Sequence, residues 1–126
     1  MNWLVIISGL VAAFCTVGHF AIGSKQFLQP MLQASFDDVP KKVMHCVFHY
    51  VSVYLVLSTI FLLAIGLGYN FNSEPSLLVK FIAIHYAVFA VSQLIIAATS
   101  KIQNAFFKLF QWIFFTLIAV TAWLGA

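Results

Sequence analysis

The sequence predicts an all-α integral membrane protein, folded as a four-helix transmembrane bundle. Of its 126 residues, 63% are hydrophobic and only 7% are charged, with a mean hydropathy of +1.06. In a soluble domain about a quarter of the residues are charged. One bilayer crossing takes ~20 apolar residues, so this length holds four crossings in a single domain, residues 1–126. The small net charge of +3 is dispersed, which excludes nucleic acid as a partner.

The first helix is expected at about residues 3–24, ending just before Lys25. No basic residue precedes its apolar run, and the run is longer than the h-region of a signal peptide. We therefore interpret it as a permanent helix. Gly9, Thr16 and Gly23 recur every seven residues and form a face small enough for close packing against a neighbouring helix.

The second helix is expected at about residues 39–68, with Asp38 as its N-cap and Pro40 in its first turn. In the loop before it, Pro30 should end or bend any continuation of the first helix. Four polar side chains of this helix share one stripe, because their spacing is i, i+4, i+7 and i+14. They are His45, His49, Ser52 and Thr59.

The third and fourth helices are expected at about residues 75–99 and 105–124. Asn72 or Ser73 is the expected cap before the third helix. The fourth contains Gln111 but no histidine and no continuous polar stripe. We interpret its phenylalanine-rich stretch, FFKLFQWIFF, as a lipid-facing or packing surface.

The lysines set the expected orientation. Lys80 stands alone on one side of the expected bundle, whereas the other lysines lie in or beside the first and third loops. The positive-inside rule then places these two loops in the cytoplasm and both termini outside, in what we expect to be a bacterial inner membrane. The lysines of these loops are Lys25, Lys41, Lys42, Lys101 and Lys108.

The histidines of the first two helices predict a transition-metal site. His45 and His49 project from one helical face, a common arrangement for gripping one ion. With a rise of ~1.5 Å per residue, His19 reaches a similar depth in the neighbouring helix. Imidazole and thiolate ligands suit copper or zinc. The expected ligands are His19, His45 and His49, with Cys15, Cys46 and Gln93 as further ligands or supporting groups. The alternative is that these histidines only hydrogen-bond backbone, glutamine or tyrosine groups.

Haem b is a second candidate cofactor. Coordination by two histidines needs two rings on facing helices at similar depth, which His19 and His49 could supply. One haem leaves His45 unused, and His85 lies about three helical turns away from the others, which argues against a second haem.

The positions of the carboxylates exclude two kinds of membrane site. All three acidic residues fall in the expected loops, so the membrane helices offer no acidic relay and no carboxylate-bridged di-iron site. No set of nucleophile, base and acid is visible, so we expect a protein that is not an enzyme by itself. With Cys15 and Cys46 both in apolar runs, no disulfide framework is expected.

The leading functional prediction is therefore metal or haem binding in the membrane, in ion handling or in support of a redox enzyme. One alternative is a small oligomeric channel or transporter with titratable histidines along a polar track. Another is a non-catalytic accessory or assembly subunit, with the lipid bilayer and a second copy or a partner membrane subunit as its contacts. Serine and threonine in membrane helices also simply tie helices together. The residues of the track are Ser8, Ser52, Thr59, His85 and Ser92.

Overall fold

A computed structural model describes residues 1–69 and 74–126, so the expected cap at Asn72 or Ser73 lies outside the described residues. The described chain is 85% helical and contains no strand, which confirms the all-α prediction. Three helical segments are long and apolar enough to cross a membrane, namely Trp3–Gln33, Asp38–Gly66 and Pro75–Thr99.

The first of these segments consists of α1 (Trp3–Gly18), the π-helical η1 (His19–Leu28) and α2 (Gln29–Gln33). It continues past the expected end near residue 24, and from His19 to Leu28 its backbone hydrogen-bond pattern is that of a π-helix. The Gln29 N–H donates to the Ser24 carbonyl, five residues back, as in a π-helix. Pro30 then falls in the first turn of α2, where a missing N–H is tolerated.

The second segment is α3 (Asp38–Gly66), whose N-cap is Asp37 and not the expected Asp38. After α4 (Pro75–Thr99), the expected fourth helix is divided into α5 (Ala105–Lys108) and α6 (Gln111–Gly125). Across this division, the Trp112 Nε1–H donates to the Phe106 carbonyl at 3.0 Å. The indole thus satisfies one of the carbonyls that a helix end leaves without an intrahelical partner.

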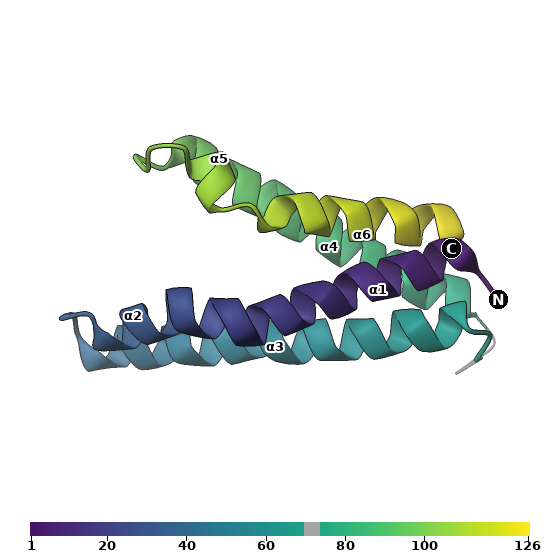
Figure 1. The fold of residues 1–126 in the computed structure, drawn as a ribbon, viewed down its shortest axis with the longest axis horizontal. Helices are drawn as coiled ribbons and strands as arrows, with labels where there is room; N and C mark the ends of the chain where they lie inside the picture. The colour runs from purple at the N-terminus through teal and green to yellow at the C-terminus, as the bar shows by residue number, and fades with distance from the viewer. Residues whose placement is uncertain (70–73) are drawn as a thin grey trace.

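The helices form two antiparallel pairs, α1 with α3 and α4 with α6 (Figure 1). The backbones of the two pairs approach most closely at α1 and α6, whereas the backbones of α3 and α4 come close at few positions. Figure 1 shows that they converge at the end holding both termini and diverge toward α2 and α5. Among the most buried side chains are Val5, Leu62, Tyr86 and Ile118, one from each of α1, α3, α4 and α6.

The heptad face of the first helix packs against α3, as predicted. Gly9 lies so close to Leu63 that an added Cβ would sit 3.0 Å from its backbone nitrogen. The Thr16 hydroxyl lies 3.1 Å from the Thr59 hydroxyl, and Gly23 faces an aromatic ring of α3. Small residues therefore bring these two helices into backbone contact.

Asn2 joins three helix ends at the convergent end. Its backbone N–H donates to the Gly66 carbonyl at 2.8 Å, and its side-chain amide donates to the Gly125 carbonyl at 2.6 Å. Its side-chain oxygen also accepts the N–H of Val5, which caps α1. This end of the molecule is consequently held by both packing and hydrogen bonds.

Candidate functional site

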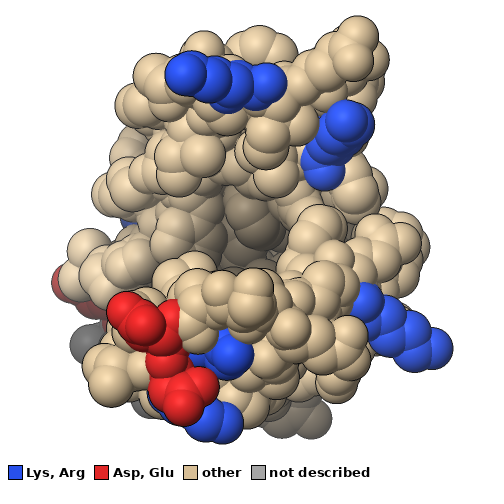
Figure 2. All heavy atoms as spheres, turned by 90° about the vertical axis from the view of Figure 1, so that its left-hand side faces the viewer, with Lys and Arg blue, Asp and Glu red and all other residues tan. Residues whose placement is uncertain are grey.

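A cleft opens between the two helix pairs at their divergent end, and Figure 2 shows it as a deep central hollow. Two neighbouring cavities of about 210 and 440 Å³ make up the cleft, and both are lined by Phe27, Val51, Gln111 and Phe115. The larger one is lined by Phe27 of η1, Val51 of α3 and side chains of α4 and the fourth helix, and it is open to the surface. The cleft is therefore accessible from outside the molecule.

Aromatic side chains form much of the cleft wall, and Phe89 and Phe115 of this wall belong to a larger aromatic cluster. The Tyr54 ring of α3 contacts Phe89 and Tyr86 of α4 at centroid distances of 5.3 and 5.6 Å. Phe115 of α6 contacts both of these α4 rings at 5.8 Å. Beyond this cluster the wall includes further phenylalanines of α1, η1 and the fourth helix: Phe14, Phe27, Phe110 and Phe114.

The phenylalanine-rich stretch, which we expected to be a lipid-facing or packing surface, divides between the outer surface and the cleft. Phe107 is 81% exposed, but Phe110, Phe114 and Phe115 line the cleft. The break between α5 and α6 separates these two groups of rings. Gln111, in the middle of the stretch, was the one sequence signal that part of it faces inward.

A pair of glutamine amides lies in the cleft wall. The Gln93 side-chain N–H of α4 donates to the Gln111 side-chain oxygen of α6 at 2.6 Å. The Gln93 oxygen is buried and has no hydrogen-bond partner among the described residues. Such an unpaired buried group costs about 1–3 kcal/mol. Gln93 thus joins α4 to α6, and this hydrogen bond links it to Gln111 and not to the predicted histidine set.

His19 begins the π-helical segment and faces α3. Its Nε2 lies 2.8 Å from the Ser52 hydroxyl, and its ring stacks on Phe48 with the centroids 4.1 Å apart. The Ser52 hydroxyl already donates to the Phe48 carbonyl at 3.0 Å. A hydroxyl has one hydrogen, so the His19 Nε2–H is the donor in the other bond. In the neutral ring only Nδ1 then remains as an acceptor or metal ligand.

His45 and His49 lie together on α3, with ring centroids 5.0 Å apart. Neither ring has a hydrogen-bond partner in the described part of the chain, and His49 is exposed. Phe48 contacts the rings of both His49 and His19, with centroids 5.5 and 4.1 Å away. Within residues 1–69 and 74–126, no three histidine, cysteine or acidic residues are grouped as they would be around a metal ion.

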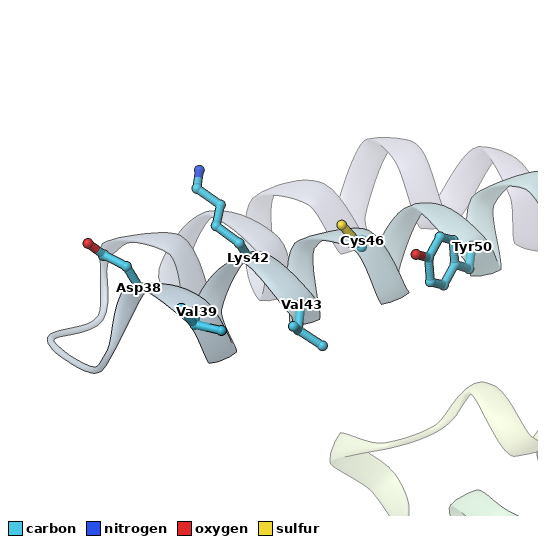
Figure 3. Close-up of a pocket in the computed structure, with 6 residues that line it drawn as sticks. All are labelled: Asp38, Val39, Lys42, Val43, Cys46 and Tyr50. Carbon is cyan, nitrogen blue, oxygen red and sulfur yellow. The ribbon is translucent and has the colours of Figure 1, made fainter.

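The two cysteines lie in different settings. Cys15 of α1 lines the cleft, and Cys46 is exposed on α3. Figure 3 shows Cys46 in a shallow groove of α3 that is also lined by Lys42 and Tyr50. Both thiols are free.

Several residues of the predicted polar track form hydrogen bonds with backbone or side-chain groups. The Ser8 hydroxyl donates to the Ile118 carbonyl at 3.0 Å, which ties α1 to α6. Ser52 and Thr59 bind α1–η1 side chains as described above. His85 lies 2.9 Å from the Phe81 carbonyl and stacks on Tyr54. Ser92 lines the larger cavity.

The sequence reasoning missed one buried polar contact. The Ser58 and Tyr86 hydroxyls lie 2.7 Å apart and join α3 to α4. Both residues are almost completely buried, with 2% and 0% of their surface exposed. Ser58 stands next to Thr59 of the predicted stripe, but nothing in the linear sequence pairs it with a tyrosine of the next helix.

No protein-family model, curated protein or solved structure matches this chain.

Proposed function

We propose that this chain is a four-helix integral membrane protein that binds a small amphiphilic molecule from the bilayer in the cleft between its helix pairs. The single observation that carries this proposal is the cleft itself, with its aromatic walls and a few polar groups. Ligand pockets typically combine apolar and aromatic walls with a small number of polar groups.

The proposed membrane arrangement combines the three long helices with a fourth crossing by α5 and α6. Helix α6 has 15 residues and spans ~22 Å, which is short of the ~30 Å hydrocarbon core. We propose that α5 and the adjoining turn complete this crossing. The first and third loops then lie in the cytoplasm with the lysines, and both termini lie outside.

The open side of the cleft favours a ligand that dissolves in the membrane. The larger cavity is open to the surface, and we propose that bilayer lipid lies at this opening. The polar atoms lining the cleft include His19, Gln93 and Gln111. An amphiphile suits such a site because its chain fills the aromatic part while polar atoms bind these groups.

Gly18 offers a direct test of this proposal. It lines the cleft, and a Cβ atom added there meets no other atom within 4 Å. Gly18→Trp should therefore place its indole in the smaller cavity of the cleft, and Gly18→Ala is the matched control. The purified variants are reconstituted in liposomes with a diazirine-bearing phospholipid, and the photolabelled residues are identified by mass spectrometry.

We expect labelling of cleft residues such as Phe114 and Phe115 in the native protein and in Gly18→Ala, and its loss in Gly18→Trp. Val88 of α4, which is 55% exposed, serves as the internal reference for surface lipid. Labelling confined to outward residues such as Val88, and equal in all three proteins, would falsify the proposal.

The histidine pair favours a second candidate function, the binding of copper or zinc. The observation behind it is that the centroids of the His45 and His49 rings lie 5.0 Å apart. Neither ring has a hydrogen-bond partner within the described ranges. Water, a second copy or a partner subunit would complete the coordination. His19 would join only through Nδ1, since its Nε2–H is bound to Ser52.

Metal content after purification without a chelator tests this candidate. We expect loss of a stoichiometric metal in His45→Ala and His49→Ala, and its retention in the control His85→Ala. A Soret absorption band would instead indicate haem b, which His19 and His49 would hold after displacement of the Phe48 ring that contacts both. A metal-free, colourless preparation would exclude both the metal and haem b as cofactors.

A further inference from the structure

The mouth of the cleft carries an excess of positive charge. The mouth is the divergent end of the molecule, where the cleft opens. Lys25 lies there in η1, beside the α1–α3 pair, and Lys101 and Lys108 lie there beside the α4–α6 pair. Figure 2 shows basic side chains on opposite sides of the central hollow. All three lysines are exposed. Both helix pairs therefore carry ammonium groups at the end where the cleft opens.

Acidic groups compensate only part of this charge. The divergent end carries Lys25, Lys41, Lys42, Lys101 and Lys108 against Asp37 and Asp38, which leaves five minus two, or +3. Lys41 and Asp38 lie 3.9 Å apart. In the described part of the chain, no carboxylate lies within salt-bridge distance of Lys25, Lys101 or Lys108.

We infer that the occupant of the cleft is an anionic lipid of the surrounding bilayer, with its acyl chain among the aromatic side chains and its phosphate at the lysines of the mouth. This inference rests on the proposed function and adds the charge of the ligand. A lysine binds phosphate as a point charge on a long flexible stem. Such a stem lets an exposed lysine reach a headgroup at the cleft mouth.

A competing explanation is that these lysines only set the orientation of the protein in the membrane. That role needs no lipid in the cleft, so the two explanations predict different results with purified protein in liposomes. A lysine near an anionic membrane surface contributes ~1 kcal/mol, which is about fivefold in binding. We expect each lysine of the mouth to change occupancy of the cleft by about this factor.

The experiment compares diazirine-bearing phosphatidylglycerol with phosphatidylcholine of the same chains, at constant ionic strength. Cleft labelling is normalised to labelling of Val88. The variants are Lys25→Gln and Lys108→Gln, and the matched control is Lys80→Gln, which removes the same charge from α4 near its opposite end. Circular dichroism verifies that each variant keeps its helix content.

We expect phosphatidylglycerol to label the cleft at least about fivefold more than phosphatidylcholine. Lys25→Gln and Lys108→Gln should each lower this preference, and Lys80→Gln should preserve it. Equal labelling by the two lipids, or an equal loss in Lys80→Gln, overturns the inference. Displacement of the lipid by inorganic phosphate overturns it as well, since the site would then recognise a free anion.

The inference and the proposed function fail in different ways. If both lipids label the cleft equally and Gly18→Trp abolishes both signals, the cleft binds amphiphiles without regard to charge. If neither lipid labels the cleft, the proposed function itself is wrong.

Discussion

Substitution of Gly66 by alanine should separate α1 from α3 and destabilise the protein. A Cβ atom at this position would lie 2.7 Å from Ile6 Cγ1 and 2.9 Å from the Ile6 backbone nitrogen. Nonbonded heavy atoms prefer separations of about 3.5–4.0 Å. The Ile6 side chain can rotate away, but its backbone nitrogen can move only with α1. The shift also stretches the 2.8 Å hydrogen bond from the Asn2 N–H to the Gly66 carbonyl.

The expected loss follows from two opposing effects. Overpacking of a close contact costs about 1–3 kcal/mol, and replacing a helical glycine by alanine returns about 0.5–1 kcal/mol. Gly66→Ala should thus lower the free energy of unfolding by roughly 1–2 kcal/mol. Gly18→Ala is the control, because its Cβ meets no atom within 4 Å and only the helical gain of up to about 1 kcal/mol remains.

The assay is reversible unfolding in mixed micelles of mild detergent and sodium dodecyl sulfate, followed by circular dichroism. We expect the midpoint to fall for Gly66→Ala and to stay level or rise for Gly18→Ala. If Gly66→Ala proves as stable as Gly18→Ala, α1 and α3 do not meet at the backbone distance described here.

Three further predictions concern hydrogen bonds between helices. Asn2→Ala should lower the free energy of unfolding by about 1–2 kcal/mol, since it removes the cap of α1 and the bond to the end of α6; an unchanged melting temperature would contradict this role. Ser58→Ala should cost about 1–3 kcal/mol because it leaves the buried Tyr86 hydroxyl unpaired, and adding Tyr86→Phe should recover part of that loss. A double-mutant cycle without coupling would show that the two hydroxyls do not interact. Gln111→Leu should destabilise the protein by about 1–3 kcal/mol, whereas the double variant with Gln93→Leu should lie closer to the native protein. Equal losses in the single and double variants would contradict the amide pairing.

Composition and local spacing determined the class of the protein and much of its helix content. Apolar runs of bilayer length fold as helices because only a helix or a closed barrel satisfies the backbone of a membrane segment internally. The heptad recurrence of Gly9, Thr16 and Gly23 also identified the face that packs, since a repeat of seven returns to nearly the same side of a helix. The i, i+4 spacing likewise brought His45 and His49 together.

Helix ends and breaks were less predictable. The sequence predicts that Pro30 ends or bends the helix. In the structure the π-helical η1 precedes it, and the proline falls in the first turn of α2. The fourth helix breaks at Leu109 without a proline or glycine, and the Trp112 indole supports the break from the following turn. Where a helix ends or breaks depends on contacts with neighbouring side chains. Local helix propensity carries no information about these contacts.

The sequence by itself determined an all-helical chain with long apolar helices, a small-residue packing face on the first helix and a histidine pair on α3. Only the tertiary structure decided that the two helix pairs diverge, that Phe114 lines a cleft and that His19 binds Ser52. The physical reason is that periodicity specifies the faces of one helix, whereas the angle between helices depends on contacts between residues far apart in the chain. Asn2, Gly66 and Gly125 illustrate this, since they lie at three distant points of the sequence and together close one end of the molecule.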